Sequence, residues 1–180
     1  MEFDINESAE TPFCEALQML VNEHENILRL LDLAQNIIDK DELTPDLLDK
    51  LSDIIFYVKN YADKYHHAKE ENILFEKGQP VQTIINVMLA EHERSREYIR
   101  AAVSAIESGN QPQVKQFIGD YINLLQQHID KENNILYRFF EKMLTDEDKN
   151  EMLHAFEDAN KKQDADLENN LLKLLDENNV

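Results

Sequence analysis

Helix-breaking residues are scarce in this chain of 180 residues, which contains only 3 Gly and 4 Pro. The long segments between them are rich in Leu, Ile, Ala, Glu, Lys and Gln, which favour helices. Because Gly and Pro are the strongest interruptions of a helix, the chain has few places to turn. The sequence therefore predicts an all-α fold built from long helices.

Four segments carry apolar residues at helical spacing, and each is bounded by a turn signal. The expected boundaries are Thr11-Pro12 at the start of the first helix, Thr44-Pro45 at the start of the second, Gly78 and Gly109 after the second and third, and Pro112 at the start of the fourth. Short connections make neighbouring helices antiparallel. We therefore predict an antiparallel up-down-up-down four-helix bundle.

The predicted bundle spans residues 11–144. Residues 145–180 have weaker apolar patterning and open on Thr145-Asp146-Glu147-Asp148, a sequence that resembles a capping box at a helix start. We expect this C-terminal extension to form an additional short helix or helices packed on the outside of the bundle.

Two stretches of the chain repeat one pattern, H-x-x-K-E-x-N-I-L-aromatic, beginning at His66 and at His128. In each copy a His and the Glu four residues later share one helix face. Each copy is preceded by a lone His between two Glu, placed within the apolar stripe of its helix. Four imidazoles and two carboxylates are a suitable ligand set for two metal ions inside a helical bundle. The candidate ligands are His24, His66, Glu70, His92, His128 and Glu132.

A second His and Glu pair, His67 and Glu71, lies one residue further along the second helix. At about 100° per residue, these two side chains rotate towards solvent, whereas His66 and Glu70 stay near the apolar stripe. Superposing the two N-I-L-aromatic segments also matches Glu70 with Glu132. We therefore select His66 and Glu70 as ligands, and expect His67 and Glu71 to lie around the ligands or at the surface.

A buried network without metal is the alternative interpretation of the six residues. Each buried polar group without a partner costs about 1–3 kcal/mol, and a pair of metal ions would provide partners for all of them. Mixed imidazole and carboxylate ligands suit iron, manganese or zinc, and Cys14 is the only thiol in the chain. We expect Tyr61, Tyr65 and Tyr121 to pack in the core near the ligands or to donate hydrogen bonds to them, and His154 to lie at the surface.

The net charge of −19 argues against nucleic acid and anionic membranes as partners, because an acidic surface repels both. A lone cysteine excludes an intrachain disulfide. The N-terminus, residues 1–6, lacks the basic flank and apolar run of a signal peptide. No apolar stretch approaches the roughly 20 residues needed to span a bilayer. The expected location is cytoplasmic.

This order of residues resembles the hemerythrin-like (HHE cation-binding) domain family over residues 14–144. The resemblance implies a non-haem di-iron centre, with two Fe ions joined by carboxylates and an oxo or hydroxo group, and with Zn or Mn as substitutes. In that family pattern His24, His66, His92 and His128 would be terminal ligands, and Glu70 and Glu132 would bridge the two ions.

Two positions depart from the oxygen-carrying hemerythrins. Those proteins have a second His four residues after the lone His of the third helix, where this chain has Arg96. They also have His-x-x-x-x-Asp on the fourth helix, where this chain has His128-x-x-x-Glu132. The pattern is similar to the hemerythrin-like domains of iron or oxygen sensors and of iron–sulfur-cluster repair proteins. The small N-terminal domain and Cys pair of many repair proteins have no equivalent in this sequence.

The expected function is the binding or sensing of a small ligand such as O2, NO or peroxide. One alternative is a di-iron enzyme that removes peroxide or NO, or repairs iron–sulfur clusters, and turnover with a redox partner would identify it. The other alternative is a structural or regulatory helical bundle that a metal only stabilises. That interpretation predicts a closed site without small-molecule adducts.

Overall fold

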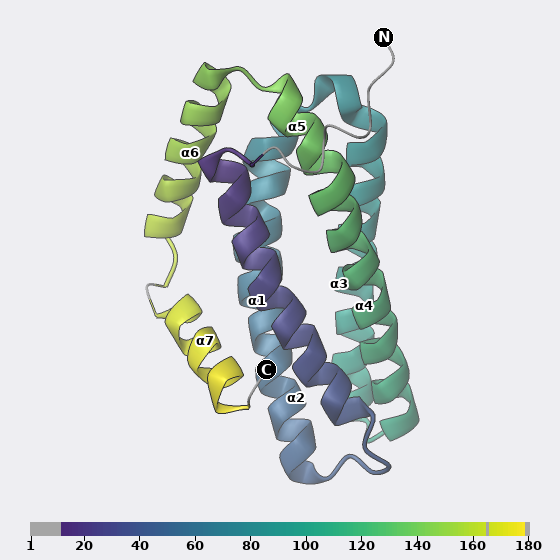
Figure 1. Cartoon of the computed structure of the whole chain (residues 1–180). Helices are drawn as coiled ribbons and strands as arrows, with labels where there is room; N and C mark the ends of the chain where they lie inside the picture. Colours follow the sequence, from purple (N-terminus) through teal and green to yellow (C-terminus); the bar gives the residue numbers. More distant parts are fainter. Residues whose placement is uncertain (1–11, 165, 179–180) are drawn as a thin grey trace.

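A computed structural model describes residues 12–164 and 166–178 of the chain. Four long helical segments run up and down in turn, so that sequential neighbours are antiparallel (Figure 1). The first is α1 (Glu15–Ile38); the second joins α2 (Pro45–Tyr57), η2 (Val58–His67), η3 (Glu70–Leu74) and η4 (Phe75–Lys77); the third is α3 (Gln82–Glu107), after the short turn η5 (Gln79–Val81); the fourth joins α4 (Gln111–Lys131), η6 (Glu132–Leu136) and α5 (Tyr137–Met143). No strand occurs in the described residues, and the all-α prediction is confirmed.

Most predicted helix boundaries agree with the structure, and the start of the first helix is the exception. Pro45 opens α2 after Thr44, and Gly109 follows α3 with a positive φ of 68°. However, α1 begins at Glu15 and not near Pro12, because Cys14 is extended. The backbone N–H of Cys14 donates a hydrogen bond to Glu141 in α5 (2.6 Å), which holds Cys14 against α5. Thr11 and the segment 1–6 lie outside the described residues.

The second and fourth helices change to π-helical winding where they carry the repeated motif. The segments η2, η3 and η6 are π-helical, and the N–H of Ala68 bonds the carbonyl of Asp63, five residues earlier. A π-helix turns through fewer degrees per residue than an α-helix, and such segments are frequent at functional sites. The winding therefore changes which residues of the second helix face inward.

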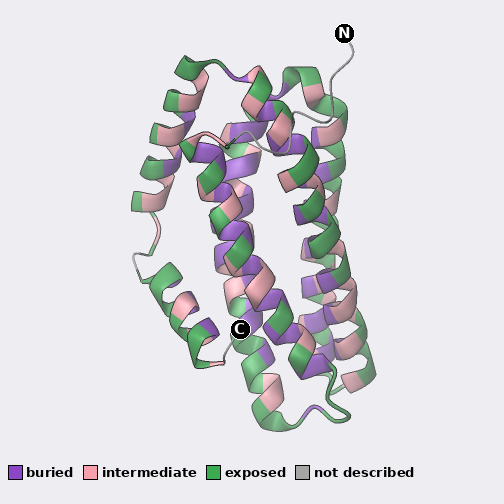
Figure 2. Ribbon diagram, viewed as in Figure 1, coloured by how far each residue is buried: buried purple, intermediate pink, exposed green. Residues whose placement is uncertain are grey.

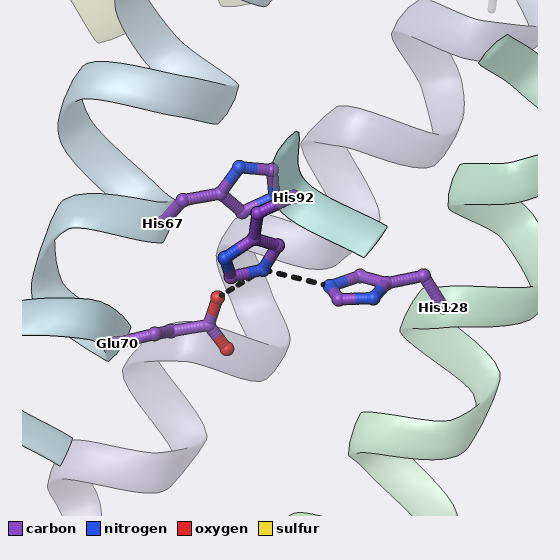
Figure 3. A group of neighbouring side chains, drawn as sticks. All are labelled: His67, Glu70, His92 and His128. Atoms are coloured by element: carbon purple, nitrogen blue, oxygen red, sulfur yellow. Dashed lines mark hydrogen bonds and ion pairs between the residues drawn. The ribbon is translucent and has the colours of Figure 1, made fainter. Parts of the chain in front are cut away.

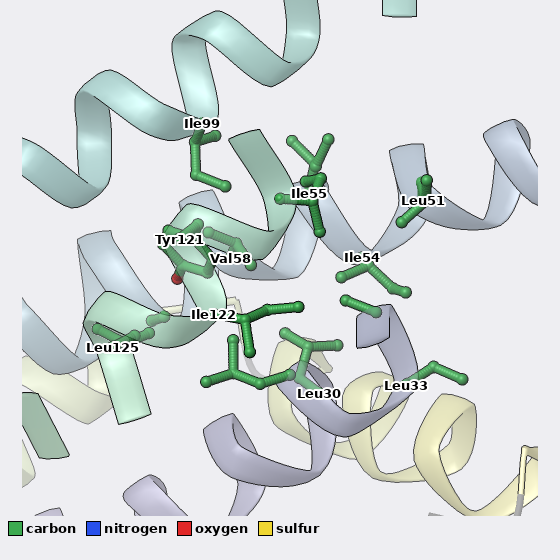
Figure 4. Packing of buried hydrophobic residues seen from close by; sticks show 14 of the residues in the cluster. Leu30, Leu33, Leu51, Ile54, Ile55, Val58, Ile99, Tyr121, Ile122 and Leu125 are labelled. Atoms are coloured by element: carbon green, nitrogen blue, oxygen red, sulfur yellow. The ribbon is translucent and has the colours of Figure 1, made fainter. Parts of the chain in front are cut away.

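Two apolar clusters fill the bundle, one towards each end. The buried faces of the four helices point towards the inside of the bundle (Figure 2). The first cluster includes Leu30, Ile54, Ile99, Tyr121 and Leu125, and part of it is drawn in Figure 4. The second includes Leu20, Leu74, Met88, Leu136 and Phe140. On each helix, candidate ligands lie where the residues of one cluster give way to those of the other. On α1, Leu20 belongs to the second cluster and Ile27 to the first, and His24 lies between them. The candidate ligands therefore occupy the layer between two apolar clusters.

The C-terminal extension forms two helices, α6 (Asp146–Lys161) and α7 (Leu167–Glu177). Both contact α1, and α6 also contacts η3, so they lie along one side of the bundle (Figure 1). Phe156 of α6 is buried in the second cluster, and Leu171 of α7 in the first. In the part of the chain that the structure describes, no helix has the length and apolar character to cross a bilayer.

The start of α6 provides a test of helix capping. The Thr145 hydroxyl accepts a hydrogen bond from the N–H of Asp148, whose side chain bonds the Thr145 N–H in return. We expect the Thr145→Ala substitution to lower the free energy of unfolding by about 1 kcal/mol, as for other helix caps. Urea denaturation followed by circular dichroism measures this change. Thr44→Ala is the matched control, because Thr44 makes no side-chain cap bond, and an equal loss there would contradict the argument.

Candidate metal centre

All six sequence-derived candidates, together with His67, are buried between the two apolar clusters. They come from all four helices of the bundle: His24 from α1, His66 and His67 from η2, Glu70 from η3, His92 from α3, His128 from α4 and Glu132 from η6. Each is at most 2% exposed. Charged and polar side chains are rarely buried without partners, so this concentration predicts that the seven residues share partners.

The seven residues form two overlapping groups, each with ligand atoms within 4.8 Å of one another. We name them position A and position B. Position A consists of His24, His66, Glu70 and Glu132, and position B consists of His67, Glu70, His92 and His128, as drawn in Figure 3. Glu70 belongs to both positions.

The two glutamates lie between the two sets of imidazoles. Glu70 Oε2 is 3.6 Å from His66 Nε2 and 3.5 Å from His92 Nε2. Glu132 reaches both positions as well, since one oxygen is 3.3 Å from His24 Nε2 and the other 3.2 Å from His128 Nε2. Each carboxylate is therefore placed where it could bridge two cations.

Several buried polar atoms of these seven residues have no hydrogen-bond partner among the described residues. They are Nε2 of His24 and His66, Nδ1 of His67, Oε2 of Glu70 and both carboxylate oxygens of Glu132. In addition, His92 Nε2 lies 3.0 Å from His128 Nε2. Leaving so many buried groups unpaired would cost about 1–3 kcal/mol each. The residues present therefore fit a metal pair, because two cations would provide partners for these lone pairs.

The outward nitrogens of four of the imidazoles are held by oxygen atoms of surrounding side chains. The Nδ1 atom of His24 donates to Asn133 (2.8 Å), and that of His66 donates to Glu23 (2.9 Å). The Nδ1 atom of His92 donates to Glu71 (2.8 Å), and that of His128 donates to Glu91 (2.9 Å). A donor role at Nδ1 leaves the lone pair on Nε2, which faces the centre. Such bonds orient metal-binding imidazoles and raise their basicity.

Protonation in the metal-free protein follows from this burial. Burial lowers the pKa of His67 to about 3 and that of His66 well below its usual value, so both rings are neutral. Burial also opposes charge on His128, but Glu132 and Glu91 outweigh it and raise the pKa of His128 to about 9. Neutral imidazole is the form that binds metal.

The pKa values of the two glutamates shift in opposite directions. Burial and the neighbouring Glu132 raise the pKa of Glu70 well above its usual value. Burial acts in the same direction on Glu132, but His128 outweighs it and lowers the pKa of Glu132. A divalent cation between the two carboxylates would favour the charged form of both. Metal binding is therefore expected to release the proton from Glu70.

Tyr137 contacts two candidate ligands, and the sequence analysis did not include it. Its hydroxyl donates a hydrogen bond to Glu70 Oε1 (2.5 Å), and its ring stacks on His24 with centroids 5.6 Å apart. The available signal was the last position of the repeat, where Tyr137 matches Phe75. The three tyrosines considered from the sequence do not touch the ligands in this way. Tyr61, for example, donates to Glu168 of α7 (3.1 Å).

The expected outward orientation of His67 is wrong. His67 is 2% exposed, and its ring stacks on that of His92 with centroids 3.9 Å apart. The π-helical winding of η2 is the physical reason, since it places His66 and His67 inward together, whereas the expectation assumed α-helical winding. Glu71 lies around the ligands as expected, bonded to His92. His154 is at the surface, as predicted.

Replacing His67 tests position B directly. We expect the His67→Ala variant to bind the ion of position B more weakly and to lose part of its metal on dialysis, because position B loses one of three imidazoles while position A keeps its ligands. Elemental analysis of the purified protein measures this. His154→Ala is the control, since that side chain is exposed. Full metal content in the His67→Ala variant would remove His67 from the ligand set.

The fold and the site together define a metal-binding protein of the helical-bundle class. The model of the family described as Hemerythrin HHE cation binding domain matches residues 15–140, and the chain belongs to that family. The match includes every residue of positions A and B. A comparison with curated proteins finds no match to this chain.

Proposed function

We propose that this chain is a non-haem di-iron protein that binds or senses a small ligand such as O2, NO or peroxide. The observation that carries the proposal is the placement of Glu70 and Glu132 between two sets of imidazoles. Family membership supports metal binding, and the absence of thiolates from both groups favours iron, manganese or zinc. When bound, an iron pair would supply the electrons for chemistry with O2, NO or peroxide.

The protein residues would hold this pair and shield it from water. His24 and His66 would complete position A, and the other three imidazoles would complete position B. The Tyr137 hydroxyl keeps its proton, since burial and Glu70 raise its pKa, and it fixes the orientation of Glu70.

A small ligand also agrees with the space around the centre. A cavity of about 160 Å³ borders the outer side of position B, with His67, Ser95, Arg96 and Tyr121 among its lining residues. Organic ligands of drug size occupy pockets of roughly 300–1,000 Å³. A cavity of this size suits a molecule of a few atoms.

Metal content and the visible spectrum test this function together. The full chain is loaded with Fe²⁺ without oxygen, its iron content is measured, and the spectrum is recorded before and after exposure to air, NO or peroxide. A pair of irons per chain, with near-ultraviolet bands that appear on oxidation and bleach on reduction, is the expected result. Reversible O2-dependent bands indicate binding, and repeated turnover of peroxide or NO indicates an enzyme. Zinc alone, or iron that gives no adduct, would contradict the proposal and favour a structural role.

A further inference from the structure

The internal repeat extends beyond the ligands to the residues that hold them. In the first half, Glu23 bonds both His66 Nδ1 and the ammonium group of Lys69. In the second half, Glu91 bonds His128 Nδ1 and Lys131 in the same way. The Glu before each lone His thus holds the His and the Lys of the following motif. The two halves therefore build equivalent supports, and differences between them identify what distinguishes the two positions.

Four positions break this equivalence, and all four polar residues lie beside position B. Asp63, His67 and Glu71 of the second helix correspond to Leu125, Ile129 and Asn133 of the fourth. Arg96 of the third helix corresponds to Leu28 of the first. Leu125 and Ile129 belong to the first apolar cluster, and Leu28 packs against it. One half of the repeat therefore has three apolar residues where the other half has an imidazole, a carboxylate and a guanidinium.

Arg96 joins these residues into one network. Its Nε donates to Asp63 Oδ1 (2.9 Å) and its Nη2 to Glu71 Oε1 (2.7 Å). Glu71 in turn accepts from His92 Nδ1, and Asp63 Oδ1 lies 3.7 Å from His67 Nδ1. The rigid guanidinium fork suits two carboxylates better than a lysine ammonium would. His92 is thus oriented by a carboxylate that Arg96 holds, and the second carboxylate that Arg96 holds lies beside His67.

We propose that Arg96 is a positioning residue that makes position B the tighter metal position and the first to fill. The proposal rests on the metal pair of the proposed function. Position B has three imidazoles and position A has two. Moreover, His92 is held by a carboxylate, whereas His24 is held by the neutral amide of Asn133. A carboxylate partner raises the basicity of a metal-bound imidazole more than an amide does. Without Arg96, Asp63 and Glu71 would lose the cation that fixes their position.

Titration of the metal-free full chain with Co²⁺ tests this proposal, because Co²⁺ reports its coordination through visible absorption bands. Calorimetry and absorption should show two separate binding steps in the wild-type protein. In the Arg96→Met variant we expect the first step to weaken about 10–100-fold, as for loss of other outer partners of metal ligands, with the second step unchanged. Arg96→Lys should recover part of the loss, because an ammonium group can hold one carboxylate.

Arg94→Met is the matched control on the same helix. Arg94 is 61% exposed and pairs only with Glu97 among the described residues, so its loss should leave both steps unchanged. Two equal steps in the wild-type protein, or an unchanged first step in the Arg96→Met variant, would overturn the proposal. A wild-type chain that binds one ion only would contradict the metal pair. In that case, weaker binding of the single ion by the Arg96→Met variant would support the role of Arg96, and unchanged binding would overturn it.

Discussion

The Glu70→Ala variant should lose both metal ions. Glu70 is the residue that positions A and B share, and its Oε2 atom lies 3.5–3.6 Å from an imidazole nitrogen of each. Removal also leaves the Tyr137 hydroxyl, which is completely buried, without its acceptor. We expect metal content to fall by about tenfold or more, since a shared ligand supports both ions. Elemental analysis after dialysis measures the bound metal.

Glu76→Ala is the matched control, since Glu76 is an exposed acidic residue further along the same helical segment. It should keep its metal. If the Glu70→Ala variant kept one ion, Glu70 would belong to a single position. If it kept both, Glu70 would not be a ligand of either.

The Lys69→Met variant should be strongly destabilised. Lys69 is 2% exposed, and its ammonium group pairs with Glu23, lies 3.7 Å from the centroid of the Tyr65 ring and donates to Asn160 of α6 (3.2 Å). Removing one partner of a buried ion pair leaves the other charge uncompensated, which typically costs about 3–5 kcal/mol. Protonation of Glu23, whose pKa burial already raises, would limit the loss. Urea unfolding of the metal-saturated protein measures the change.

The repeat supplies the control for this substitution. Lys131 pairs with Glu91 in the equivalent place, but α6 does not cover that side, and the Lys131 side chain is 34% exposed. Lys131→Met should therefore cost less than about 1 kcal/mol, as for exposed pairs. Equal losses in the two variants would show that burial by the C-terminal extension does not set the strength of the Lys69 pair.

The fold was predictable because residues that favour helix starts and ends lie at most of the helix boundaries. Thr44-Pro45 and Gly109 interrupt a sequence with few other breakers, and Thr145 opens α6 with the expected reciprocal bonds. The true start of α1 was not predictable, because a long-range bond from Cys14 to Glu141 decides it. The residues next to Cys14 in the sequence do not indicate such a long-range contact.

The site was predictable where the helices follow regular geometry. The repeat identified six buried residues that the structure brings together, because a spacing of four places a His and a Glu on one face. His67 was misplaced because π-helical winding depends on packing between helices and not on the spacing of apolar residues. The role of Tyr137 was missed because the sequence does not show whether a phenol hydroxyl at a core position meets a carboxylate or only fills space.

The layer of ligands between the two apolar clusters also bears on how the molecule unfolds. A row of buried polar groups interrupts the apolar packing halfway along the bundle, so the two ends share few apolar contacts across it. Metal ions bound in that layer would tie all four helices together at this level and couple the two ends energetically. We expect the metal-loaded protein to unfold in one cooperative transition. After chelation, hydrogen exchange should show the two ends opening with different free energies, as separate cooperative units.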